Sequence, residues 1–288
     1  MDFGILKIHR LKRSNIIIGI ILFVLFLDQS LKIWVKTNME YGEYFKLFGL
    51  DWAQIHFVEN NGMAFGLSMG ETPGKIVLGL FLLMVLSFLY YFFNNKEESG
   101  VAPWMVYSFM VVIATAAITG LMGGNDDYGK LALSLFRIAA VFFLIYYISQ
   151  LLDTEVHFGL LLSFALILAG ALGNIIDSAV YGKIFSASPY HGGLAELFPE
   201  GGGYADFLYG KVVDMLYFPM INGRFPDWMP FWGGEHFLFF RPVFNLADTS
   251  ITLGVLNILF FQRDFFADLE ESKELERKSE ELEERKEE

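Results

Sequence analysis

Near the end of the sequence, an aspartate lies at the start of a long apolar run. Between Val243 and Phe261 the side chains are almost all apolar, apart from Asp248 and a few uncharged polar residues. Such a run is typical of a membrane-spanning helix. A carboxylate at the centre of such a helix costs roughly 2.5 to 3.5 kcal/mol, so Asp248 marks a candidate functional site and a partner is expected. The best candidate is Asp214, in the strand-like piece from Gly210 to Met215.

The composition is that of a membrane protein. Hydrophobic residues make up 54% and aromatic residues 17% of the 288 positions, and the mean hydropathy is +0.44. These values are too high for an ordinary soluble domain of this length. The absence of cysteine excludes disulfides, thiolate metal sites and a cysteine nucleophile. The histidines show no spacing typical of metal ligands, and we expect neither a metal, nor a cofactor, nor a nucleic-acid partner.

Six apolar runs predict an all-α integral membrane helix bundle with a small β-rich segment on its outer side. The predicted spans are about 14–36, 74–93, 101–122, 130–152, 157–177 and 243–263, within a membrane domain of residues 1–263. Basic residues before the first span place the N-terminus in the cytoplasm by the positive-inside rule. An even number of spans returns the charged tail, 264–288, to the same side. The segments 37–73 and 179–242 then face outward, and the aromatic residues of the second suit the headgroup layer.

Three smaller polar motifs each have a plain structural interpretation beside a functional one. Asp28 and Lys32 are four residues apart, on one helix face, and could be an interfacial ion pair or support a site. The segment from Asn60 to Gly66 contains an Asn-Gly turn. Asn174 and Asp177 follow a series of small residues, which favours close helix packing with a polar cap at the helix end.

Taken in order, these motifs resemble the signature of lipoprotein signal peptidase, the bacterial signal peptidase II. The resemblance covers about residues 14–66 and 129–263. Its motifs are Asp28-Gln29 with Lys32, Asn60 with Gly62-Met63-Ala64-Phe65, Gly173-Asn174 with Asp177, Val213-Asp214, and Phe244-Asn245 with Ala247-Asp248. Each motif is weak alone, whereas five in the correct order on an integral membrane chain are a strong signal.

The resemblance implies an aspartic endopeptidase of the bacterial inner membrane that cleaves prolipoproteins just before a diacylglyceryl-modified cysteine. Asp214 and Asp248 match the catalytic pair, near the periplasmic face. The residues that match the site-supporting or substrate-binding positions are Asp28, Lys32, Asn60, Gly62, Asn174, Asp177 and Asn245. The partners that the resemblance implies for this protein are diacylglyceryl-prolipoproteins and membrane lipids. The sequence does not indicate an oligomeric state. Two neighbouring carboxylates in a low-dielectric site share a proton, and such a pair can activate water without a metal or a covalent intermediate.

The sequence departs from the family pattern in three places. Two additional apolar runs separate Gly66 from Gly129. An arginine usually follows the acid of the Gly-Asn motif, whereas this chain has Ser178, and either Arg137 or Lys183 is a candidate for the missing cation. The outer segment is long, and Ser186–Tyr209 resembles an insertion beside the substrate entrance.

Other functions fit parts of this sequence. A transporter or proton relay would also place acids in membrane spans, but these acids cluster near one face, and no matching halves with broken helices are present. The stretch Gly66–Gly70 fits a serine-nucleophile pattern but falls in an outer loop, without the strand–turn–helix context that this motif needs. An inactive, lipid-binding relative would not require both aspartates.

Overall fold

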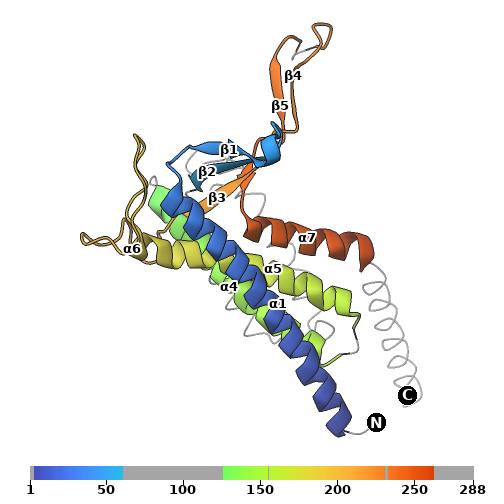
Figure 1. Cartoon of the computed structure of the whole chain (residues 1–288). Helices are drawn as coiled ribbons and strands as arrows, with labels where there is room; N and C mark the ends of the chain where they lie inside the picture. The colour runs from blue at the N-terminus through green and yellow to red at the C-terminus, as the bar shows by residue number, and fades with distance from the viewer. Residues whose placement is uncertain (1–2, 61–125, 155, 231–232, 263–288) are drawn as a thin grey trace, which may run out of the picture.

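The computed structural model describes residues 3–60, 126–154, 156–230 and 233–262 as a helix bundle with a β-sheet at one end (Figure 1). The helices are α1 (Phe3–Asn38), α4 (Asp126–Leu152), α5 (Phe158–Ile176) and α7 (Leu246–Phe261), and α5 continues through a π-helical turn, η2 (Asp177–Tyr181), into the short α6 (Gly182–Ile184). The predicted spans 74–93 and 101–122, the tail 264–288 and Gly62 lie outside the described residues.

Helix α5 lies at the centre of the bundle and packs against α1, α4 and α7. Glycines allow the closest approaches: a β-carbon at Gly170 would lie 2.2 Å from the carbonyl oxygen of Ala247, and one at Gly173 would lie 2.7 Å from Asp28 Oδ2. The predicted packing role of the small residues in this helix is therefore confirmed. Polar contacts add to it, since Ser250 donates to the carbonyl of Leu166 at 2.8 Å.

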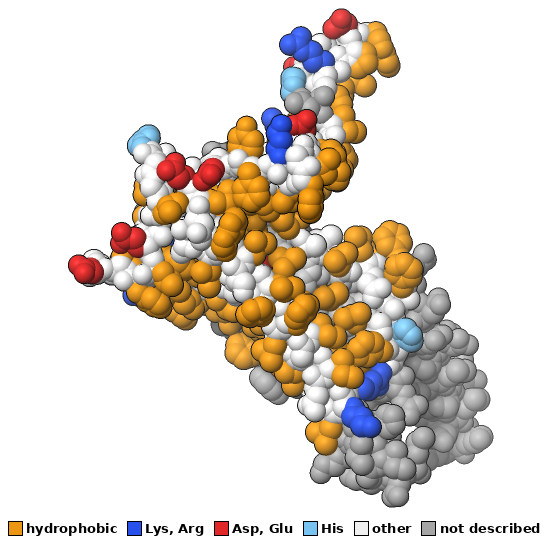
Figure 2. Space-filling model, in the orientation of Figure 1, with side chains coloured by type: hydrophobic (Ala, Val, Ile, Leu, Met, Phe, Trp, Pro, Cys, Tyr) orange, Lys and Arg blue, Asp and Glu red, His pale blue; other side chains and the backbone are white. Residues whose placement is uncertain are grey.

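The outward surface of the helices is apolar. On α1, Leu22, Phe23 and Phe26 are each at least 60% exposed, and Phe260 and Phe261 on α7 are more exposed still. In Figure 2 hydrophobic side chains cover most of the visible helical face, whereas charged side chains lie towards its ends. Arg10–Asn38 and Phe158–Ile184 are long and apolar enough to cross a membrane, and Arg137–Leu152 and Leu246–Phe261 are shorter apolar helices.

A four-stranded antiparallel sheet packs against the end of α1. Its strands are β1 (Tyr44–Lys46), β2 (Gln54–Asn60), β3 (Val212–Tyr217) and β6 (Val243–Phe244), in the order β1-β2-β3-β6, and the 3₁₀ turn η1 (Leu47–Gly49) follows β1. The buried residues Phe57, Val213 and Met215 pack with Val35 and Met39 of α1. The register places Val58 opposite Asp214. The strands predicted around Gln54–Val58 and Asp214 are therefore present.

The last helix begins later than predicted. The apolar run starts at Val243, but Val243 and Phe244 pair with Tyr217 and Leu216 of β3. Asn245 then caps α7, whose first residue is Leu246. The predicted start at 243 was therefore wrong, because an apolar run alone does not distinguish a short buried strand from the helix that follows it.

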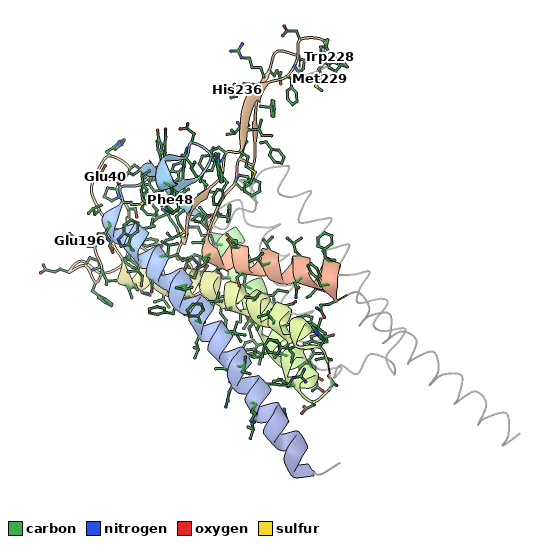
Figure 3. The ribbon with its side chains drawn as sticks, turned by 45° about the vertical axis from the view of Figure 1, so that its right-hand side comes forward. Glu40, Phe48, Glu196, Trp228, Met229 and His236 are labelled. Atoms are coloured by element: carbon green, nitrogen blue, oxygen red, sulfur yellow. The ribbon has the colours of Figure 1, made fainter. Side chains whose placement is uncertain are left out.

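A second, two-stranded sheet projects from the body. Strands β4 (Ile221–Arg224) and β5 (His236–Phe239) form an antiparallel hairpin between β3 and β6. Figure 3 shows Trp228 and Met229 at its tip, far from the helices. Trp228 is 79% exposed, while nearer the base Phe225 and Phe237 stack at 4.7 Å. The hairpin extends the aromatic surface beyond the four-stranded sheet.

Candidate active site

The two aspartates of the predicted pair come from the strand and the helix that meet at the end of the bundle. Asp214 lies in β3 and is buried, with 3% of its surface exposed. Asp248 lies in the first turn of α7 and is partly exposed. A capping box fixes this turn: Asn245 Oδ1 accepts the Asp248 amide at 2.9 Å, and Asp248 Oδ2 accepts the Asn245 amide at 3.3 Å.

Two asparagines join the aspartates by side-chain hydrogen bonds. Asn245 Nδ2 donates to Asp214 Oδ1 at 2.8 Å and to Asn174 Oδ1 at 3.1 Å. Asn174 Nδ2 in turn donates to Asp248 Oδ1 at 2.8 Å. From β2, Asn60 Nδ2 donates to Asp214 Oδ2 at 3.1 Å. Five predicted site residues, from four separate motifs of the sequence, thus form one network.

Behind this network lies a fully buried ammonium group. Lys32 Nζ lies 2.9 Å from Asp28 Oδ2, 2.9 Å from Asp177 Oδ2 and 3.1 Å from Asn174 Oδ1. An ammonium has three N–H donors, so all of them are used. Lys32 and Asp177 are 0% exposed and Asp28 is 1% exposed. The Asp28–Lys32 pair is therefore part of the site's interior rather than an interfacial ion pair.

Asp28 and Asp177 also hold the backbone beside each aspartate of the pair. Asp28 Oδ1 accepts the amide of Ala247, which precedes Asp248, at 2.9 Å. Asp177 Oδ2 accepts the amide of Val213, which precedes Asp214, at 3.1 Å. Because both carboxylates contact Lys32, one side chain connects the start of α7 to β3.

Two residues that the sequence-based site did not include complete this interior. Gln29 Nε2 donates to Asp28 Oδ2 at 3.0 Å and to Asp177 Oδ1 at 3.0 Å. Tyr181 Oη donates to Gln29 Oε1 at 3.0 Å. Gln29 belongs to the first motif, and an amide within an apolar run was the available signal. Tyr181 carried no such signal, because its contact depends on how η2 packs against α1.

The Asp214 carboxyl has a strongly perturbed acidity. Burial first, and then the negative charge of Asp248, raise its pKa to about 7, against the opposing effect of the Lys32 charge and of hydrogen bonds from Asn60 and Asn245. A carboxyl group with this pKa retains its proton for much of the time near neutral pH. The site therefore combines a buried aspartate that holds a proton with a more exposed one, the asymmetry that acid–base catalysis by a carboxyl pair requires.

The structure also shows where the two candidate replacements for the family arginine, Arg137 and Lys183, lie relative to Ser178. Arg137 Nη1 on α4 donates to Ser178 Oγ at 3.4 Å. Lys183 instead pairs with Asp206 at 2.6 Å, and both side chains are mostly exposed. Of the two, Arg137 is the one adjacent to Ser178.

Comparisons with known proteins identify relatives across most of the chain. A family model described as "Signal peptidase (SPase) II" matches residues 20–122 and 102–263. The lipoprotein signal peptidase of Porphyromonas gingivalis is 40% identical over 253 residues, covering 88% of this chain and 84% of that protein. That of Amoebophilus asiaticus is 31% identical over 248 residues, covering 85% and 76%. A solved structure titled as a bacterial membrane enzyme is 19% identical and covers 86% of this chain and 93% of its own, with a TM-score of 0.42.

Proposed function

The chain belongs to the signal peptidase II family of bacterial membrane enzymes, and from this premise we propose that it is an aspartic endopeptidase for lipid-modified prolipoproteins. It removes the signal peptide on the N-terminal side of the diacylglyceryl-cysteine, with Asp214 and Asp248 as the catalytic residues. The observation that carries this proposal is the hydrogen-bonded connection of the two aspartates through Asn245 and Asn174.

The raised pKa of Asp214 suggests which aspartate acts as the acid and which acts as the base. Asp214 is buried and has a pKa raised to about 7, so it holds the shared proton and polarises the scissile carbonyl. Asp248 is more exposed and acts as the base that takes a proton from the attacking water. Collapse of the tetrahedral intermediate then transfers a proton to the leaving amine of the cysteine. The supporting asparagines and the Lys32 group hold both carboxylates in place.

The arrangement of charges supports the predicted orientation in the membrane. Arg10 pairs with Asp153 at 2.9 Å, and Arg13 donates to the carbonyls of Thr154 and Val156, so the basic start of α1 and the α4–α5 connection lie together. The sheet and Asp214 lie at the other end of α1. By the positive-inside rule, we place the first end in the cytoplasm and the aspartate pair near the periplasmic face of the inner membrane.

This orientation can be tested directly because the natural chain has no cysteine. Single cysteines at the exposed positions Arg10 and Trp228 would be treated with a membrane-impermeant maleimide in intact cells from which the outer membrane has been removed. Labelling of Trp228→Cys alone is expected. Labelling of Arg10→Cys alone would invert the proposed topology.

The decisive experiment is a cleavage assay in detergent or lipid vesicles. Purified wild-type protein would receive one prolipoprotein in two forms, diacylglyceryl-modified and unmodified. We expect cleavage of the modified form alone, and its loss in Asp214→Asn and Asp248→Asn, which should stay folded. Asp206→Asn is the matched control, since Asp206 is exposed and pairs only with Lys183 among the described side chains. No cleavage of either substrate by folded wild-type protein would refute the proposal, and undiminished cleavage by either mutant would refute the proposed pair.

A further inference from the structure

Arg137 places a permanent charge within the apolar helix α4, beside the aspartate site. A charged side chain in a membrane span is costly and usually faces a functional interior. Its guanidinium reaches the helix that carries Asn174 and Asp177, where it donates to Ser178 Oγ at 3.4 Å. Ser178 is buried and itself donates to the carbonyl of Asn174 at 3.0 Å. Arg137 is therefore connected, through Ser178, to the backbone of an asparagine that holds Asp248.

The position of Arg137 is fixed by the residue one turn earlier. Ser134 lies three residues before it, on the same face of α4, and donates a buried hydrogen bond to the carbonyl of Leu208 at 3.1 Å. Leu208 lies shortly before β3, the strand that carries Asp214. The face of α4 that bears Arg137 is thus held against the segment leading into the site.

The charge balance of the site explains why a second cation belongs there. The site contains four aspartates, two in the interior and two in the pair, and the Lys32 ammonium forms ion pairs with the two interior ones, Asp28 and Asp177. Arg137 is attracted electrostatically to Asp248 first, and then to Asp177 and Asp214. Asp248 itself accepts a hydrogen bond from Asn174 and interacts electrostatically with Arg137 from α4 and with Asp214 from β3.

The guanidinium also has hydrogen-bonding capacity beyond Ser178. Arginine carries five N–H donors in a planar group, and its charge persists at every physiological pH. Among the described residues, its hydrogen bond to Ser178 uses one of these donors. A fixed, charged group of this kind can act on a neighbouring carboxylate through the low-dielectric interior without forming a direct ion pair.

We propose that Arg137 is a positioning residue for the aspartate pair, supplied by α4 to the place beside Ser178. The inference rests on the proposed peptidase function and adds to it the residue that replaces the arginine expected at position 178. The guanidinium attracts the Asp248 carboxylate electrostatically and holds, through Ser178, the asparagine that donates a hydrogen bond to it. Ser178 is small enough to let the longer side chain approach from the neighbouring helix.

The test compares Arg137→Gln, Arg137→Lys and the double variant Arg137→Gln/Ser178→Arg in the cleavage assay, with full pH profiles. By analogy with the loss of one preorganised donor, Arg137→Gln should lower kcat/KM about 100-fold. The ascending limb of its profile, which reports ionisation of the base, should move upward by about one pH unit. Arg137→Lys should keep the wild-type limb. The double variant should recover at least about tenfold of the loss, because it returns the cation to the same place from the other helix.

The matched control is Lys183→Gln, the exposed cation that pairs with Asp206, and it should cleave like the wild type. The proposal is overturned if Arg137→Gln cleaves with the wild-type pH profile, whatever its rate. A folded Arg137→Gln without measurable activity is decided by the double variant. If Arg137→Gln does not fold, the double variant decides: a folded double variant with no activity overturns the proposal, and an active one supports it. Absence of cleavage by the wild type would instead refute the peptidase function, so the two failures are distinguishable.

Discussion

Lys32 and Lys36 lie one turn apart on the same face of α1, and neither side chain is exposed to solvent. Lys32 contacts two carboxylates, Asp28 and Asp177, so its cluster has an excess of negative charge. Lys36 shares a single carboxylate, Glu59, with Lys211, so the second cluster has an excess of positive charge. The same residue type, on the same helix, therefore serves two different electrostatic environments.

The Lys36 cluster connects the sheet to the outer loop. Lys36 Nζ donates to Ser188 Oγ at 3.0 Å and lies 5.3 Å from the ring centre of Phe185 and 5.1 Å from that of Tyr204. These contacts lie in or beside 186–209, the segment predicted to be an insertion at the substrate entrance. Such cation–π contacts and buried hydrogen bonds order a loop without touching the aspartates.

The two clusters differ in the part of the molecule that their hydrogen bonds reach. Those of Lys32 reach, through Asp28 and Asp177, the amides that precede Asp248 and Asp214. Those of Lys36 reach the outer loop. We infer that the first cluster positions the catalytic groups, whereas the second holds the outer wall of the site. Paired substitutions of the two lysines can break or sharpen this distinction.

The largest effect is expected for Lys32→Met. The substitution leaves Asp28 and Asp177 buried without their cation, which costs about 3–5 kcal/mol of unfolding free energy. It also loosens both aspartates, so cleavage should fall below detection. Lys36→Met is the matched control: an identical change one turn away should leave cleavage within about tenfold of the wild type. The free energy of unfolding would be measured by SDS titration in mixed micelles, with unfolding monitored by tryptophan fluorescence, in parallel with the cleavage assay. Equal loss of activity in both variants would remove the distinction.

A smaller effect is expected for Asp28→Asn. The amide oxygen can still accept the Ala247 amide, but the ion pair with Lys32 is lost, at a cost of about 1–3 kcal/mol. Because Asp28 acts through the backbone before Asp248, cleavage should fall about ten- to a hundredfold. The limbs of the pH profile should not move. Asp153→Asn, at the opposite end of the bundle, is the control. A shifted profile in Asp28→Asn would mean that Asp28 takes part in the proton transfers.

The pH dependence of cleavage by the wild type tests the aspartates that the Lys32 cluster positions. The folded protein raises the pKa of Asp214 to about 7, mainly by burial, so the protonated form predominates below that value. As the pH rises through it, Asp214 ionises and the pair loses its acid. The kcat/KM value should therefore fall about tenfold per pH unit on the alkaline side. A flat profile up to pH 9 would contradict the role of Asp214 as the acid.

The sequence predicted the composition of the site better than its connections. The order of the motifs identified both aspartates and the two asparagines that join them, since each stands out against an apolar background. The four-residue spacing indicated that Asp28 and Lys32 meet, but not that Asp177 joins them, because that contact depends on how α5 packs against α1. Likewise, Arg137 and Lys183 were equivalent candidates in the sequence. Only the position of α4 distinguishes the cation beside Ser178 from the exposed one that pairs with Asp206.

The limits of the fold prediction have a similar physical origin. Long apolar runs predicted helices because a hydrophobic stretch of that length has few other stable forms in a membrane. The same criterion missed the strand at Val243–Phe244, which is apolar for a different reason: it pairs with β3. The projecting hairpin was also not predicted as strands, since its aromatic residues indicated a headgroup-layer segment without indicating its register. Local composition identified the environment of these segments, and tertiary pairing determined their shape.

The smallest effect on cleavage is expected for Glu59→Gln, together with a loss of stability that depends on pH. Burial alone would raise the pKa of Glu59, but the Lys36 ammonium, Ser188 and Lys211 lower it below its usual value. A carboxyl with a lowered folded-state pKa stabilises the protein above its unfolded-state pKa, and this contribution is lost as the pH falls through the folded-state value. Glu59→Gln should therefore be less stable than the wild type by about 1–3 kcal/mol at pH 7, and the difference should shrink in acid.

Because the outer cluster does not contact the aspartates, the variant's cleavage should stay within a fewfold of the wild type. A difference in stability that is independent of pH would show that the charge of Glu59 contributes nothing, and that the loop is held by packing alone.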